Sequence, residues 1–227
     1  MSEPMDAFAD PQAVAHYADG PPRFVPGYQA MQRMAALLLA ERSPDDARVL
    51  VLGAGGGLEL RAFAEAYPDW SFDGVDPSAP MLKLAEQTLG PLAARARLHQ
   101  GIIDDAPDGP FDAASCLLTF HFMARDERRR TASAIRNRLK PGAPFVTAHL
   151  SFPQDDDARA RWLSRHAAFL IASGLDPDQA ANARLAIDSK THILAPEQDE
   201  AILREAGFHD VSLFYAAFSF RGWVAYA

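Results

Sequence analysis

A glycine cluster between a short apolar run and a helical pattern is the segment of this sequence best suited to chemistry. It reads Val-Leu-Gly-Ala-Gly-Gly-Gly-Leu-Glu, with Gly53, Gly55 and Gly57 at alternate positions. Glycine lacks a Cβ and tolerates a positive φ, so such a backbone can turn sharply and lie against a ligand. A buried strand that turns into a helix in this way is typical of nucleotide-binding folds, and we predict a ligand-binding loop here.

An acidic residue ends the next apolar run, Trp-Ser-Phe-Asp-Gly-Val-Asp, which spans residues 70–76. A carboxylate at the end of the second strand can accept hydrogen bonds from both hydroxyls of a ribose, which is the role we predict for Asp76. Capping of the next helix is the alternative role. The dinucleotide fingerprint requires a further glycine at position 58, where this chain has Leu58, so an adenosine-type cofactor is favoured over a dinucleotide.

Several other polar residues follow predicted strands. His121 lies at the carboxyl edge of the predicted sheet, where an imidazole could orient an acceptor or take a proton, and packing between two phenylalanines is the alternative. His149 ends a later strand in a comparable way. Asp104 and Asp105 could accept a hydrogen bond from an adenine amino group or be solvated. The histidines lack the spacing of metal ligands, so no metal site is expected.

The elements that would position these residues alternate along the middle of the chain. Expected strands are 48–53, 70–75, 96–100, 111–119 and 144–149, and expected helices are 57–66, 78–88 and 125–138. Strands that alternate with helices form a parallel sheet. Three helical segments follow, and then two β-type segments: 155–173, 177–187, 196–206, 210–216 and 218–226. The last two have little sequence between them, which predicts an antiparallel pair.

The N-terminal residues 1–45 are expected to form a helical cap. It would contain a short helix near residues 11–18, an extended segment marked by Pro21, Pro22 and Pro26, and a helix over 27–41. The length of 227 residues suits a single domain. We divide that domain into the cap, a cofactor-binding half and a helical insert with a terminal hairpin: 1–45, 46–150 and 151–227.

Charge and composition restrict the partners. The net charge is −8, so the chain as a whole would repel a phosphate backbone, and nucleic-acid binding is not expected. The single cysteine, Cys116, lies in an apolar run and is expected to be a small core residue. The sequence has no signal-peptide pattern, and its longest apolar helical stretch, 34–40, is too short to span a bilayer. These observations predict a cytoplasmic protein without membrane contact.

Together these motifs resemble those of class I S-adenosylmethionine-dependent methyltransferases. The resemblance rests on the glycine loop and on Gly-Val-Asp-Pro-Ser-Ala-Pro-Met-Leu, Phe-Asp-Ala-Ala, Arg-Leu-Lys-Pro-Gly-Ala and Ala-Gly-Phe. It implies an α/β fold with a Rossmann-like seven-stranded, mostly parallel sheet, a reversed terminal strand, helices on both faces and an N-terminal cap. It also implies S-adenosyl-L-methionine as cofactor, held by the three alternate glycines, by Asp76 on the ribose, and by Ala54, Pro77, Met81, Ile102, Ile103 and Leu117.

Two further segments resemble carboxy-S-adenosylmethionine synthase, a bacterial tRNA-wobble-modification enzyme family that uses S-adenosylmethionine and prephenate. They are Arg-Phe-Val-Pro-Gly-Tyr, which ends at Tyr28, and the tail Glu-Ala-Gly-Phe with Phe-Arg-Gly-Trp-Val. This resemblance implies that Tyr28 contacts the cofactor and that Arg184 holds an added carboxylate. The chain departs from that family's pattern where an acid and two asparagines are expected, at Ile102, at Leu117 or Leu118, and at Pro77.

The main prediction is a methyltransferase that acts on a small-molecule acceptor. The sulfonium methyl is already activated, so alignment and exclusion of water can supply much of the rate, and His121 is needed only if the acceptor must lose a proton. A carboxy-S-adenosylmethionine synthase-like enzyme is the first alternative. A non-catalytic cofactor-binding module is the second, and a nicotinamide dehydrogenase is a distant third. The terminal region is compatible with a homodimer.

Overall fold

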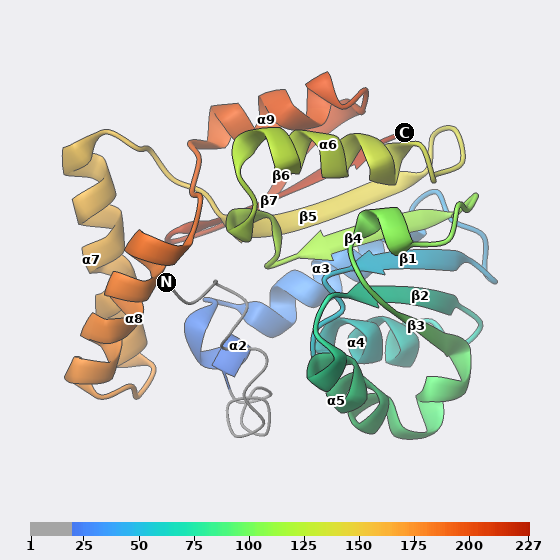
Figure 1. Ribbon diagram of the computed structural model, residues 1–227, viewed down its shortest axis with the longest axis horizontal. Coiled ribbons are helices and arrows are strands. Elements are labelled where there is room, and N and C mark those ends of the chain that lie inside the picture. The colour runs from blue at the N-terminus through green and yellow to red at the C-terminus, as the bar shows by residue number, and fades with distance from the viewer. Residues whose placement is uncertain (1–19) are drawn as a thin grey trace.

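The computed structural model describes residues 20–227, so the short helix expected near residues 11–18 lies outside the described part. A seven-stranded sheet with the strand order β3-β2-β1-β4-β5-β7-β6 forms the centre of the molecule (Figure 1). Strands β1 to β5 are parallel, whereas β7 runs antiparallel to both β5 and β6. The predicted fold class, including the reversed terminal strand, is confirmed. The strands are β1 Arg48–Leu52, β2 Ser71–Asp76, β3 Ala96–Gln100, β4 Ala113–Leu117, β5 Pro144–Leu150, β6 His209–Ala217 and β7 Phe220–Tyr226.

The helices agree with the expected positions to within a few residues. They are α2 Gly20–Phe24, α3 Tyr28–Ala40, α4 Leu58–Ala66, α5 Ala79–Leu89, α6 Arg125–Arg136, α7 Asp156–Ala172, α8 Pro177–Lys190 and α9 Pro196–Glu205, with short 3₁₀ turns η3 Gly90–Arg95, η4 Ile103–Asp105 and η5 Phe120–Phe122. One expectation was wrong. The segment with Pro21 and Pro22 is not extended but forms the helical turn α2, because proline is tolerated in the first turn of a helix.

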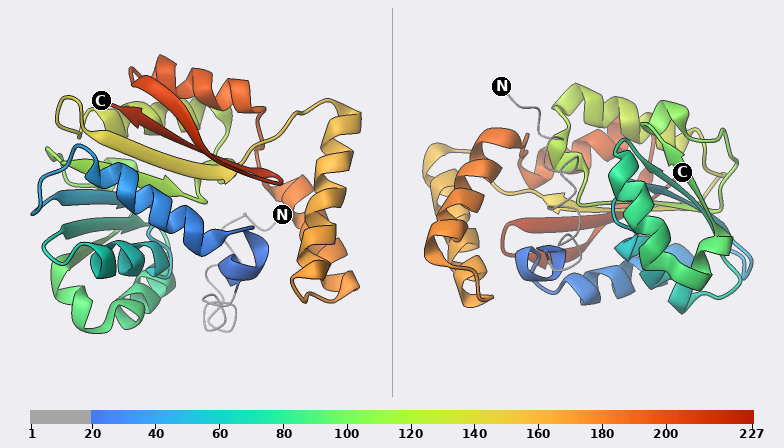
Figure 2. Two further views of the ribbon diagram at one scale, coloured as in Figure 1. Left: turned by 180° about the vertical axis from the view of Figure 1, so that it is seen from behind. Right: turned by 60° about the horizontal axis from the view of Figure 1, so that its bottom comes forward.

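The alternation of side chains along β1 shows how the sheet is covered on both faces. Val49 and Val51 belong to the core cluster shared with α3, α4 and α5, whereas Leu50 and Leu52 belong to the cluster shared with α6 and α9. Successive side chains of a strand point to opposite faces, so a strand that is apolar throughout must be covered twice. Figure 2 shows these two helical layers on either side of the sheet.

The expected N-terminal cap is built by α2 and α3 in the described part of the chain. Helix α3 is amphipathic and buries Met31, Ala35 and Leu39 completely in the core cluster that includes residues of β1 and β5. Its first turn lies at the carboxyl ends of the strands. The helix therefore belongs to one layer of the sandwich and also delivers side chains to the edge where ligands of open α/β folds bind.

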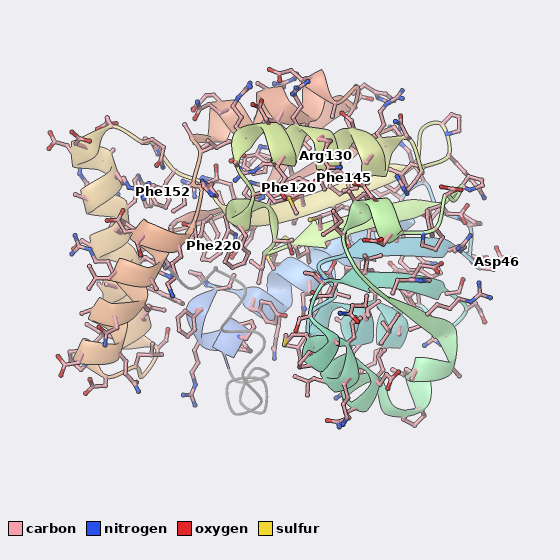
Figure 3. All side chains as sticks on the ribbon, viewed as in Figure 1. Asp46, Phe120, Arg130, Phe145, Phe152 and Phe220 are labelled. Atoms are coloured by element: carbon pink, nitrogen blue, oxygen red, sulfur yellow. The ribbon has the colours of Figure 1, made fainter. Side chains whose placement is uncertain are left out.

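Helices α7 and α8 form a hairpin beside the sheet, beyond the carboxyl end of β5 (Figure 1). Phe152 and Phe220 lie at the base of this hairpin (Figure 3) and are buried in the core. Arg159 of α7 pairs with Asp188 of α8 at 2.7 Å. Helix α8 buries only Ala180 among its own residues, so most of its surface is open to solvent. None of the described helices is long and apolar enough to cross a membrane.

A buried ion pair joins α6 to α9. The guanidinium of Arg128 contacts the carboxylate of Asp199 and donates a hydrogen bond of 2.7 Å to the main-chain oxygen of His192. Asp199 also accepts from the Ser151 hydroxyl at 2.6 Å and lies 3.2 Å from His149 Nε2. Burial opposes ionisation of Asp199, but His149, Arg128 and Ser151 outweigh it and lower the pKa of this carboxyl. Loss of one partner would leave an uncompensated charge in the core.

The substitution Asp199→Asn is therefore expected to lower the free energy of unfolding by about 3–5 kcal/mol, because it leaves Arg128 charged and unpaired in the core. Urea unfolding followed by circular dichroism measures this change. The matched control is Glu205→Gln, since Glu205 pairs with Arg125 at 3.0 Å between the same two helices but on the surface. That control should change stability by less than about 1 kcal/mol. Equal effects of the two substitutions would contradict a special role for the buried pair.

Candidate functional site

A cavity of about 350 Å³ lies at the carboxyl ends of β1, β2 and β4. Its walls come from α3, the glycine loop, the first turns of α4 and α5, the ends of β2 and β3, the segment after β4, and α6. The residues that line it are Tyr28, Gln32, Leu52, Gly53, Ala54, Gly55, Leu58, Glu59, Asp76, Pro77, Met81, Gly101, Ile102, Ile103, Leu117, Leu118, Thr119, Phe122, Met123, Glu127, Arg130 and Thr131. The structure thus brings together every residue assigned above to the cofactor except Gly57.

The glycine loop is fixed to the neighbouring strand by main-chain hydrogen bonds. The amides of Gly53 and Ala54 both donate to the carbonyl of Val75, at 2.8 and 3.0 Å. Gly53 has a φ of +77°, and a Cβ on it would lie only 2.0 Å from the Thr119 hydroxyl oxygen. Only glycine therefore fits at this position, and the backbone itself forms the cavity wall.

Gly57, the third glycine assigned to the cofactor, packs against α5 in the structure. Its φ is +81°, and a Cβ on it would lie 2.8 Å from the Cα of Ala85. The absence of a side chain lets the start of α4 approach α5 closely. Gly57 does not line the cavity, and its close packing on α5 supports the loop.

Asp76 is held rigidly at the end of β2. Its two carboxylate oxygens accept hydrogen bonds from the amides of Gly55 and Ser78, both at 2.9 Å. Burial raises the pKa of Asp76, and the hydrogen bonds from Ser78 and Gly55 oppose that rise. The helix cap of α5 is Ser78, whose hydroxyl accepts from the amide of Met81. Asp76 is therefore not the helix cap, and each of its oxygens can accept a further hydrogen bond from a ligand.

Helix α3 contributes a polar pair to the cavity. Gln32 Nε2 donates a hydrogen bond of 2.9 Å to the hydroxyl of Tyr28. The preceding segment is anchored because the hydroxyl of Tyr215 donates to the main-chain oxygen of Pro26. Tyr28 and Gln32 are both buried at the cavity wall and carry no charge.

The opposite wall is formed by the segments that follow β3 and β4. The Ile102 side chain is 47% exposed at the mouth of the cavity. Asp105 accepts a hydrogen bond from the Ile102 amide and so closes the turn, and Asp104 pairs with Arg130 of α6 at 2.8 Å. Neither aspartate lines the cavity, although both lie next to residues that do.

The two residues proposed for catalysis are not brought to the cavity. His121 is buried and its Nδ1 faces the amide of Leu150 in β5. Burial lowers the pKa of His121 well below its usual value, and the nearby His149 and Arg128 lower it further. Successive side chains of the turn η5 point in different directions, so Phe122 and not His121 lines the cavity. Arg184 lies exposed on α8, in the hairpin beside the sheet, and does not line the cavity.

A buried acid at the cavity wall was missed by the sequence analysis. Glu59 lies in the first turn of α4, is 7% exposed, and accepts a hydrogen bond from the Ser115 hydroxyl of β4. Burial raises the pKa of Glu59 to about 8, and the Ser115 hydrogen bond opposes that rise. The spacing of apolar residues could have revealed it. Glu59 and Phe63 are four residues apart, so on the expected helix they share one face, and that face is the buried one.

The charges of the cavity limit what it can hold. Arg130 is the only basic residue that lines it within residues 20–227, and that guanidinium already pairs with Asp104. The acids Glu59 and Asp76 are buried, and most other lining groups are apolar side chains or backbone. Such a site suits a ligand with hydroxyl groups and positive charge better than one with several phosphates. Residues 20–227 contain no group of three or more His, Cys, Asp and Glu that could hold a metal ion.

Comparisons with known proteins agree with this geometry. A family model described as a methyltransferase domain matches residues 50–145. The carboxy-S-adenosyl-L-methionine synthase of Chromohalobacter salexigens is 28% identical to the chain, and the alignment covers 100% of this chain and 87% of that protein. The enzyme of the same name from Actinobacillus succinogenes is 25% identical over 89% of this chain and 86% of that protein.

Solved structures share the fold at lower identity. The structure of PigF with SAH superposes with a TM-score of 0.71 at 16% identity, and the match covers 99% of this chain and 62% of that chain. Human N-acetylserotonin methyltransferase in complex with SAM gives a TM-score of 0.67 at 14% identity, with 98% and 58% covered. The chain thus spans about three fifths of these longer neighbours. Residues 50–145 match a methyltransferase domain, the chain shares the fold of S-adenosylmethionine-dependent methyltransferases, and it resembles the carboxy-S-adenosyl-L-methionine synthases along its length.

Proposed function

We propose that this protein binds S-adenosyl-L-methionine in the cavity and transfers its methyl group to a small-molecule acceptor. The observation that carries the proposal is the position of Asp76. Its carboxylate is fixed by the amides of Gly55 and Ser78 beside a glycine loop whose backbone forms the cavity wall. This arrangement fits a ribose with two free hydroxyl groups.

The residues present fit the cofactor without a phosphate-binding element. Bound S-adenosylmethionine supplies an activated sulfonium methyl group. Asp76 would accept hydrogen bonds from the ribose, while Gly53, Ala54 and Gly55 would lie against the ligand through their backbone. The apolar side chains Pro77, Met81, Ile102, Ile103 and Leu117 would enclose the adenosine and exclude water. Tyr28 and Gln32 would cover the ligand from α3.

The methyl acceptor would be aligned by shape and not by a dedicated histidine. His121 faces β5, and none of the six histidines within residues 20–227 lines the cavity. Phe122, Met123 and Leu118 form an apolar wall beside the proposed cofactor site. We therefore expect an acceptor atom that is already nucleophilic, because alignment and exclusion of water are what this cavity can supply.

A carboxy-S-adenosylmethionine synthase-like activity is the second candidate, and relatives that match along 89–100% of the chain favour it. An added carboxylate would need a cation. Arg184, the residue assigned to that role by resemblance, lies on the exposed α8, and Arg130 is paired with Asp104. Ile102 and Leu117 also present apolar groups to the cavity where that family's pattern has polar ones. The geometry therefore supports methyl transfer better.

We further infer that the protein works in the cytoplasm on a small molecule and not on a nucleic acid, which agrees with its net charge of −8. Self-association is part of the same proposal. Large apolar side chains are exposed on α8 and on the terminal hairpin, at Leu185, Leu213 and Phe218.

Methyl transfer and carboxy-S-adenosylmethionine synthesis can be distinguished by their products. Incubation of the protein with methyl-labelled S-adenosylmethionine and a fractionated small-molecule extract should yield S-adenosylhomocysteine and a labelled small molecule. Incubation with prephenate should yield no carboxylated cofactor, because the residues described around the cavity offer no free cation for the added carboxylate. Mass spectrometry detects both products. Formation of the carboxylated cofactor would overturn methyl transfer in favour of the second candidate.

The substitution Asp76→Asn should weaken binding of S-adenosylhomocysteine by about 10- to 100-fold, because charged hydrogen bonds to hydroxyl groups are worth roughly 1.5–3 kcal/mol. Titration calorimetry measures the affinity, and NAD should not bind either protein. Asp69→Asn is the control, since Asp69 is an exposed acid before the opposite end of β2. Unchanged affinity of the Asp76 variant would refute the ribose assignment.

Lowering the pH should weaken binding of the nucleoside through Asp76. Burial raises the pKa of Asp76, and only the ionised carboxylate can accept hydrogen bonds from both ribose hydroxyls. Affinity for 5′-methylthioadenosine, which keeps the ribose but lacks the amino acid part, should therefore fall as the pH is lowered through the raised pKa of Asp76. The Asp76→Asn variant should bind weakly with little dependence on pH. An equal pH profile for both proteins would count against Asp76.

A further inference from the structure

Glu59 is a carboxyl group at the cavity wall that the proposed ribose and adenosine contacts do not use. Its side chain projects from the first turn of α4, two residues after Gly57. Oε1 accepts a hydrogen bond from the Ser115 hydroxyl, whereas Oε2 makes no hydrogen bond with any residue of the described chain. A carboxyl that is more than nine-tenths buried and half satisfied therefore faces the space where a ligand would lie.

No basic side chain within residues 20–227 forms an ion pair with Glu59. The other ionisable residues that line the cavity are Tyr28, Asp76, Glu127 and Arg130, and Arg130 pairs with Asp104. The neighbouring residue of β4, Cys116, supplies no positive charge either, because its thiol is fully buried and burial raises its pKa. Burial raises the pKa of Glu59 itself to about 8, so the side chain is neutral at pH 7 without a ligand.

The place of Glu59 on the helix argues against a purely structural role. It shares the buried face of α4 with Leu60, Phe63 and Ala64, where an apolar side chain would pack without any desolvation cost. An acid with a strongly shifted pKa at a cavity wall is a candidate for ligand recognition. A positively charged group with hydrogen-bond donors is the partner that would satisfy Oε2 and restore the charge of the carboxylate.

We propose that Glu59 is a positioning residue that binds the α-ammonium group of the cofactor's amino acid portion. This inference rests on the proposed function, in which S-adenosylmethionine occupies the cavity. The ammonium group has three N–H donors, whereas the sulfonium has none and must stay open to the acceptor. Asp76 and Glu59 flank the glycine loop, so one acid would hold the ribose and the other the amino acid end. On binding, the carboxyl of Glu59 releases its proton to solvent and the resulting carboxylate pairs with the ammonium.

The test compares two variants and three ligands by titration calorimetry. Glu59→Gln keeps the size of the side chain and its hydrogen bond with Ser115. Glu65→Gln is the matched control, because Glu65 lies exposed on the same helix. S-adenosylmethionine and S-adenosylhomocysteine carry the ammonium group, and 5′-methylthioadenosine does not. We expect the Glu59 variant to bind the first two about 10- to 100-fold more weakly and the third within about twofold of the wild type. The control should bind all three normally.

A proton count is the second readout. Calorimetry at pH 7 in buffers with different ionisation enthalpies should show that S-adenosylhomocysteine expels up to about one proton from the wild type. That release should be lost in Glu59→Gln and absent with 5′-methylthioadenosine. A residue with only a structural role would not change the proton count for one ligand alone.

The outcomes are distinct. Equal weakening of all three ligands, or no weakening at all, would overturn the role of Glu59, and weakening of S-adenosylmethionine alone would assign the residue to the sulfonium instead. Failure of the wild type to bind any of the three ligands would instead refute the proposed function. Thermal unfolding verifies that each variant is folded, and Glu59→Leu, which suits the apolar face of α4, is the second variant. It should show the same selective loss as Glu59→Gln.

Discussion

The hydrogen bonds that join the end of β2 to the glycine loop are the interaction on which the rest of this site depends. The carbonyl of Val75 receives two loop amides, and the carboxylate of Asp76 receives the amides of Gly55 and Ser78. They fix the path of the backbone between β1 and α4 and the start of α5 at the same time. The position of Glu59, in the first turn of α4, follows from that path, so both acids of the cavity are placed by one short network.

The charged residues that stabilise the core are separate from those that line the cavity. The buried cation of the α6–α9 layer, Arg128, is fully engaged by Asp199 and the loop carbonyl of His192, and it does not reach the cavity. Arg130 at the cavity mouth is held by Asp104. The cavity therefore offers acceptors and neutral surface, which agrees with a ligand that carries hydroxyl groups and positive charge. The same arrangement explains why the geometry favours methyl transfer over chemistry that adds a carboxylate.

The sequence was sufficient to predict those site residues that lie directly at the end of a strand. Gly53, Gly55 and Asp76 line the cavity because parallel strands that alternate with helices end at the same edge. His121 and Arg184 were placed by sequence position alone, and the structure puts both elsewhere. A single 3₁₀ turn rotates His121 toward β5, and α8 is carried in a hairpin that contacts α7 more than the sheet. Side-chain direction in a turn and the docking of a helical insert are not contained in residue spacing.

Local patterns in the chain were sufficient to define its strands, its helices and the glycine loop, because apolar periodicity and steric limits on the backbone act over a few residues. The reversed β7 also followed from the short connection between the last two strands. The tertiary structure alone settled which side chains meet: Glu59 with Ser115, Gln32 with Tyr28, and Arg128 with Asp199. These contacts join elements that are distant in the chain or side chains whose rotamers depend on packing. Burial, which raises the pKa of Glu59, arises only when the layers close around the sheet.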